Sequence, residues 1–155
     1  MRDHTFMDNQ FNRKDFNPND RGDFTKNKVF VAMPFKDEMT EVFYTIKYEA
    51  HKLGLKAFRV DENVNSGFII KDITQGIEDA EFVIFDLTDE RPNVYYELGY
   101  AHGVGNEGED ILLIAKEGTK IHFDIAPLRI RYYDSIDSLK AMIYLSLKTM
   151  IESTR

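Results

Sequence analysis

The sequence predicts a three-layer α/β domain, in which a parallel sheet of about five strands lies between two layers of helices. Two observations lead to this prediction. Short runs of β-branched and aromatic residues alternate along the chain with segments whose apolar residues recur at helical spacing. Such alternation implies parallel pairing and right-handed crossovers. For so few strands the expected order is 2-1-3-4-5, which places the topological switch point between the first and third strands.

The apolar runs define five expected strands. KVFVAM at 28–33 ends at Pro34, and EFVIFDL at 81–87 is typical of a strand that is buried on both faces. The other three expected strands are residues 55–60, 110–115 and 128–133.

Four segments between and after these strands have helical periodicity. Asp37 is the expected N-cap of the first helix, and Gly54 lies just past its end. Asn93, which follows Pro92, is the expected N-cap of the third. The expected helices cover about residues 39–53, 66–77, 93–105 and 139–150.

Residues 1–27 differ in composition from the rest of the chain. They contain five asparagines, balanced charges and only isolated apolar residues, with no helical or strand period. We expect a polar arm, flexible because it is too polar to offset the entropy of ordering; its spaced phenylalanines could instead dock on a partner or a second subunit. Residues 28–155 are then the α/β domain.

Composition narrows the function classes. A chain of 155 residues can bury a core without disulfides, and it has no cysteine. No apolar run resembles a signal peptide or a membrane span, so we expect a cytoplasmic protein that does not bind membranes. The net charge of -7 argues against binding to a nucleic-acid duplex. A small ligand or a protein partner is expected, and the four scattered histidines indicate no metal site.

The unusual residues follow the first and third expected strands, which is where the switch point lies. Met33, Pro34 and Phe35 follow the first strand, and Asp86 and Thr88 end the third. Ligands bind outside the carboxyl ends of strands at such a point. These residues are therefore candidates for a binding site.

Glu97 lies about one turn inside the helix that begins near Asn93 and shares a face with it. The positive end of the helix dipole would favour an ionised carboxylate there. We expect Glu97 and Asp86 to converge on one crevice. The alternative is that Glu97 only compensates the helix dipole and that Asp86 is a strand-end cap.

Other residues near the crevice have two interpretations each. Phe35, Tyr96 and Tyr100 could stack on a flat ligand or pack in the core. Asp61, in the loop after the second strand, could meet a ribose or phosphate, or belong to a solvated loop. Arg129 and Arg131 should share a face of the last strand, as a solvated pair or at the border of the crevice.

One motif does not have the context that its function requires. Residues 103–108 satisfy G-x-G-x-x-G, but they end a helix and lead into a strand, the reverse of a dinucleotide-binding loop. We expect a helix C-cap and a turn.

The segments VFVAMPF, DITQGIEDAEFVIFDLT, RPNVYYELGYAHGVG and DILLIA resemble the nucleoside 2-deoxyribosyltransferase family and its relatives, which share an architecture with TIR domains. The resemblance covers roughly residues 28–133 and implies a flavodoxin-like, TIR-like fold. It implies that Glu97 is the nucleophile at the anomeric carbon and that Asp86 handles the proton at the base. TIR enzymes that cleave NAD use a glutamate in the corresponding helix.

The chain departs from that family at two positions. The transferases usually have an aspartate that contacts the base where this chain has Asn93, and a lysine where it has Asn106. In this respect the segment is more similar to TIR-like nucleotide-binding modules of bacteria and phages, which are often linked to defence.

The sequence thus predicts an N-glycosidase that acts on a nucleoside, nucleotide or NAD. A carboxylate beneath C1′ would stabilise the oxocarbenium-like transition state or capture it as an ester. The overall reaction would be hydrolysis or deoxyribosyl transfer. No cofactor is expected, and related sites favour a homo-oligomer. The alternatives are a nucleotide-sensing module without catalysis and a protein-interaction domain. The substrate-binding candidates are Met33, Pro34, Phe35, Asp61, Thr88, Asn93, Tyr96 and Tyr100.

Overall fold

The computed structural model describes residues 23–34, 36–59, 66–90, 92–121 and 129–155, and for 66–72, 92 and 93 it describes the backbone alone. Most of the expected arm, together with Phe35 and Asp61, lies outside the described residues. Among those described, no helix combines the length and the apolar character that a membrane span needs.

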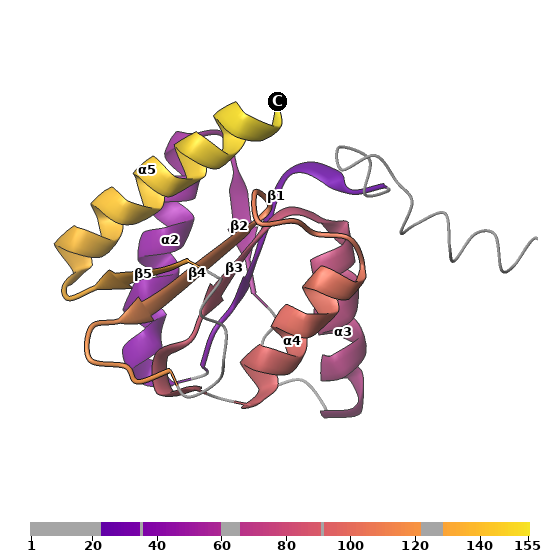
Figure 1. Ribbon diagram of the computed structural model, residues 1–155, viewed down its shortest axis with the longest axis horizontal. Coiled ribbons are helices and arrows are strands. Elements are labelled where there is room, and N and C mark those ends of the chain that lie inside the picture. The colour runs from indigo at the N-terminus through magenta and orange to yellow at the C-terminus, as the bar shows by residue number, and fades with distance from the viewer. Residues whose placement is uncertain (1–22, 35, 60–65, 91, 122–128) are drawn as a thin grey trace, which may run out of the picture.

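Five strands form one parallel sheet in the order β2-β1-β3-β4-β5, as the sequence predicted (Figure 1). The central strand β3 is buried along its whole length. The topological switch point therefore lies between β1 and β3. The strands are β1 Thr25–Ala32, β2 Lys56–Phe58, β3 Ala80–Asp86, β4 Ile111–Lys116 and β5 Ile130–Tyr133.

Strand β1 begins at Thr25, earlier than predicted. Its first residues pair with β3 through their backbone, but their side chains are polar and exposed, so the apolar pattern does not include them. Thr25 pairs with Ala80, and the register shifts before Val29. Asn27, inside this shift, has a positive φ of 70°. Its side chain accepts a hydrogen bond from Arg155 at the chain's C-terminus, at 2.7 Å. A hydrophobicity pattern does not detect a strand end of this kind.

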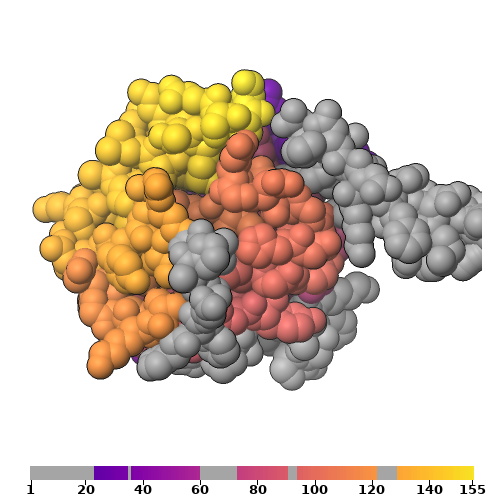
Figure 2. Space-filling model, in the orientation of Figure 1, coloured from indigo at the N-terminus to yellow at the C-terminus, as the bar shows by residue number. Residues whose placement is uncertain are grey.

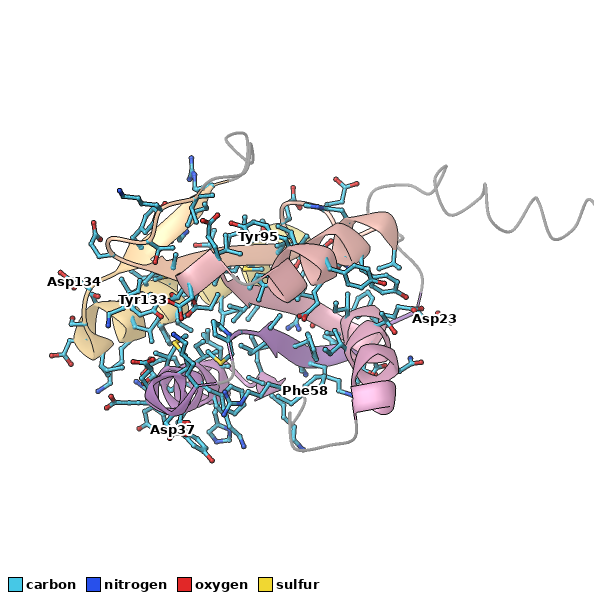
Figure 3. All side chains as sticks on the ribbon, turned by 90° about the horizontal axis from the view of Figure 1, so that it is seen from below. Asp23, Asp37, Phe58, Tyr95, Tyr133 and Asp134 are labelled. Atoms are coloured by element: carbon cyan, nitrogen blue, oxygen red, sulfur yellow. The ribbon has the colours of Figure 1, made fainter. Side chains whose placement is uncertain are left out.

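Four α-helices cover the two faces of the sheet. Figure 3 looks onto the carboxyl ends of the strands and shows α2 and α5 on one side and α3 and α4 on the other. Each side has its own cluster of buried apolar residues. The helices are α2 Thr40–Lys52, α3 Ser66–Asp79, α4 Pro92–Gly103 and α5 Ile136–Thr154, with the short 3₁₀ helices η1 Asp37–Met39 and η2 Thr88–Glu90.

Two predicted N-caps are wrong. Asp37 lies in η1, and Met39 is the N-cap of α2, without a side-chain hydrogen bond. Asn93 is the second residue of α4, which begins at Pro92, a residue whose fixed φ suits the first helical position. Gly54 does lie just past the end of α2, with φ at 78°.

The G-x-G-x-x-G segment forms the predicted turn. Helix α4 ends at Gly103, and Gly105 has a φ of 105°. The backbone N–H of Asn106 donates to the carbonyl of Ala101 at 3.1 Å, which closes the helix end before β4.

Helix α3 packs closely against β1 at Gly76. A Cβ at this position would lie 2.7 Å from Cδ1 and Cε1 of Phe30. The Phe30 ring is fixed in turn by an edge-to-face contact with Phe58, with ring centroids 5.3 Å apart. The absence of a side chain at Gly76 thus sets the distance between helix and sheet.

We expect Gly76→Ala to lower the free energy of unfolding by about 1–3 kcal/mol, because the added methyl group overpacks the core. Gly99→Ala on α4 is the matched control, since a Cβ there meets nothing within 4 Å. It should raise stability by up to about 1 kcal/mol through helix propensity. Urea unfolding of both variants measures the difference; equal effects would contradict the close packing.

Candidate active site

The candidate site lies at the carboxyl ends of β1, β3 and β4, the edge that faces the viewer in Figure 3. The chain leaves β3 at Asp86, turns through η2 and enters α4 at Pro92. Asp89 and Glu90 in this turn have positive φ values of 67° and 46°. Left-handed backbone is uncommon for residues other than glycine and is frequent at functional sites.

Asp86 is fully buried and has two partners within the chain. Its Oδ1 accepts a hydrogen bond from the backbone N–H of Thr88 at 2.9 Å. Its Oδ2 accepts one from the Tyr133 hydroxyl at 2.7 Å. Asp86 therefore ties the turn after β3 to the end of β5, which is the geometry of the strand-end cap.

Burial raises the pKa of Asp86, whereas the hydrogen bonds from Thr88 and Tyr133 lower it. The nearby charge of Asp89 raises it further.

Glu97 is only 8% exposed, yet the described residues provide no hydrogen bond or ion pair to its carboxylate. Val94, Leu98 and Ala101 beside it belong to the apolar cluster between α4 and the sheet. Burial raises its pKa from 4.5 to about 7. Glu97 is the sixth residue of α4, beyond the first turn where the helix dipole acts, so the predicted dipole stabilisation does not apply.

The structure does not bring the two acids into contact. Successive side chains of a strand point to opposite faces. Phe85 packs in the cluster beneath α4, whereas Asp86 bonds to Tyr133, which packs in the cluster on the side of α2 and α5 (Figure 3). Neither hydrogen bonds nor charge effects link Asp86 and Glu97. Of the two carboxyls, Glu97 is the one left without a partner.

The tyrosines of α4 point in different directions. Tyr96 is 64% exposed. The Tyr100 hydroxyl donates to Glu78 on α3, and the Tyr95 hydroxyl donates to Glu90 of η2 at 2.9 Å. Tyr100 thus joins the two helices, and of the predicted pair only Tyr96 is open to solvent.

The remaining predicted residues lie at the switch point, but several have internal roles. Met33 is buried, and its sulfur accepts a hydrogen bond from Nη1 of Arg59 at 3.4 Å. Pro34 is buried as well. The Thr88 hydroxyl accepts from the backbone N–H of Lys116 at 2.9 Å, which joins η2 to β4. Phe35 and Asp61 lie outside the described residues, and only the backbone of Asn93 is described.

Sequence reasoning missed the loop after β4. A cavity of about 400 Å³ opens between η2 and this loop, lined by residues 88–90 and 116–120. Gly118, with a φ of 93°, makes the turn, and Lys36 forms an ion pair with Asp89 across the strand ends. A glycine soon after an expected strand was the signal available in the sequence.

No group of histidines, cysteines and acids among the described residues could hold a metal ion.

The topology and the helices on both faces define a flavodoxin-like α/β fold. A solved structure similar to the chain is the CMP N-glycosidase BcmB of Clostridium botulinum, with a TM-score of 0.61 and 17% identity over 76% of this chain and 98% of that one. A flavoprotein of Thermotoga maritima has a TM-score of 0.61 and 15% identity over 86% of this chain.

A variant of a flavo di-iron protein of Thermotoga maritima has a TM-score of 0.63 and 16% identity over 92% of this chain. The chain spans 38% and 41% of these two flavin-related proteins. No family model and no curated protein matches the sequence. At these identities the likenesses show the fold.

Tyr133→Phe should lower the free energy of unfolding by about 1–3 kcal/mol, because it leaves one oxygen of the buried Asp86 without its donor. Tyr132→Phe is the control, since Tyr132 is 43% exposed on the same strand. Thermal unfolding of both variants measures the difference. Equal stability of the two would show that the hydroxyl does not stabilise Asp86.

Glu97→Gln should stabilise the protein increasingly as pH rises. Between the ordinary pKa of 4.5 and the folded value of about 7 the unfolded chain ionises first, so the wild-type protein loses stability through this window. The loss is complete above it and amounts to about 3 kcal/mol. Glu41→Gln, at an exposed position, is the control. Unfolding measured at about pH 4 and about pH 8 tests the shift; a difference independent of pH would contradict it.

Proposed function

We propose that the chain is an N-glycosidase that hydrolyses a nucleotide, with Glu97 as the group that meets the ribose C1′. The observation on which this depends is the buried carboxylate of Glu97, to which the described residues offer no partner, in the helix that follows the switch-point strand β3. A buried acid without a partner destabilises a fold, and such groups are concentrated at functional sites.

The pKa of about 7 suits this role. Near neutral pH a large fraction of Glu97 is ionised, and the apolar surroundings strengthen its attraction for a developing positive charge. As the bond from C1′ to the base breaks, its electron pair leaves with the base. Glu97 then stabilises the oxocarbenium ion or forms an ester with it, and water completes the hydrolysis.

Asp86 has a supporting role in this proposal. Both of its oxygens are engaged, by Thr88 and by Tyr133, so it fixes the turn that leads into α4. The departing base takes its proton from water, and a base that already carries a positive charge, such as nicotinamide, needs none.

A nucleotide is the favoured substrate class for two reasons. The BcmB protein, similar in fold over 98% of its length, is a CMP N-glycosidase. The cavity beside η2 contains two lysines that could meet a phosphate, Lys116 and Lys120, beside the acids Asp89, Glu90 and Glu117. The hypothesis has further parts: NAD or a nucleoside as the substrate, and deoxyribosyl transfer as the reaction. It also includes a homo-oligomer and a role in bacterial or phage defence.

The test is base release from CMP, other nucleoside monophosphates, nucleosides and NAD, followed by chromatography. Activity should rise with pH through about 7 as Glu97 loses its proton, and level off above that value. Glu97→Gln should lower the rate about 10³-fold, because a neutral amide cannot stabilise the cation.

Glu41→Gln should leave the rate unchanged, since Glu41 is exposed on α2. Base release from the folded Glu97→Gln protein at the wild-type rate would falsify the assignment of Glu97.

A second candidate is a nucleotide-binding module without catalysis. The engagement of Asp86 by Thr88 and Tyr133 favours it, because among the described residues no buried acid besides Glu97 lacks a partner. Binding measurements with the same ligands distinguish the binding module from the N-glycosidase. FMN is added to the ligands because of the similarity in fold to a flavoprotein. Saturable binding without any product over long incubation would support the binding module.

A further inference from the structure

A second cavity, of about 400 Å³, lies at the other end of the strands, near the amino ends of β4 and β5. It is bounded by the C-terminal half of α5, the start of β4 and the residues just before β5. Figure 2 shows the surface of α5 (yellow) meeting the segment between α4 and β4 (orange) on this side of the molecule. The cavity shares no residue with the candidate active site.

Two arginines line this cavity from the same side. Arg129 and Arg131 are two residues apart in extended chain, and Ile130 between them packs on the α4 side of the sheet. Both arginines are exposed, and no acceptor among the described residues bonds to either guanidinium. They border this cavity and not the crevice at the carboxyl edge.

Ser146 on α5 provides a second, independent observation. It is only 7% exposed and lines the cavity, yet its hydroxyl has no hydrogen bond among the described residues. A helical serine or threonine usually donates to the carbonyl four residues before it, as Thr45 does to Glu41 at 2.8 Å. A buried hydroxyl without a partner is destabilising, and a ligand in the cavity would satisfy it.

The charges of the cavity favour an anion. Two guanidiniums face one carboxylate, Glu109, on a chain whose net charge is -7. Arginine binds phosphate oxygens with paired N–H groups, and hydroxyls such as those of Ser146 and Thr149 donate to the same oxygens.

We propose that this cavity binds the phosphate group of a small molecule, with Arg129, Arg131 and Ser146 as its donors. This site is independent of the proposed catalysis, because it needs neither Glu97 nor cleavage. The phosphate can be free inorganic phosphate or part of a sugar phosphate or nucleotide.

Titration calorimetry with inorganic phosphate, ribose 5-phosphate, CMP and cytidine tests the proposal and separates these sources. Phosphate-bearing probes should bind and cytidine should not bind here. The Arg129→Gln and Arg131→Gln double variant should weaken phosphate binding at least about tenfold, and Ser146→Ala several-fold. Glu109→Gln should tighten it, because it removes the opposing charge.

Lys148→Gln is the matched control for each single arginine substitution, since Lys148 is exposed on α5 outside the cavity and its replacement also removes one positive charge. It should change affinity less than about twofold. Phosphate should shift the amide resonances of Ser146 and Thr149 in the folded protein. Absence of saturable phosphate binding, or equal weakening by Lys148→Gln and by the arginine variants, would overturn the proposal. Loss of base release alone would leave these binding results unaffected.

Discussion

The fold depends on the burial of β3 on both faces. All seven residues of this strand are shielded from solvent, and the two apolar clusters meet the sheet on either side of it. A parallel sheet of this kind is stable only when helices cover both faces. That requirement places α4 against one face of the sheet and α2 with α5 against the other. The helices leave the carboxyl ends and the amino ends of the strands open for function.

The two buried acids near the switch point differ in what surrounds them. Asp86 has a donor for each oxygen, so its burial strengthens the joint between β3, η2 and β5. Glu97 is buried without a hydrogen-bond or ion-pair partner among the described residues, and burial raises its pKa to about 7. Structural stability explains the first arrangement and not the second, because an acid that gains no partner weakens the folded state.

The carboxyl ends and the amino ends of the strands differ in the charges and the backbone turns that they carry. The carboxyl ends of the strands carry a turn of left-handed backbone at Asp89 and Glu90 and the loop after β4. The amino edge pairs Arg129 and Arg131 with a buried hydroxyl. A chain with an overall negative charge thus has two arginines at the start of the edge strand β5, and no described residue pairs with either guanidinium.

The sequence by itself determined the class of fold, the strand order and the helix that carries Glu97, because periodicity and connection rules act locally along the chain. It missed the polar start of β1 and the cavity after β4, and its N-caps at Asp37 and Asn93 are wrong. Only the tertiary structure decided that Asp86 bonds to Tyr133, 47 residues away, while no described residue pairs with Glu97. Which donor reaches a buried oxygen depends on distant segments packing together, and local patterns do not contain that information.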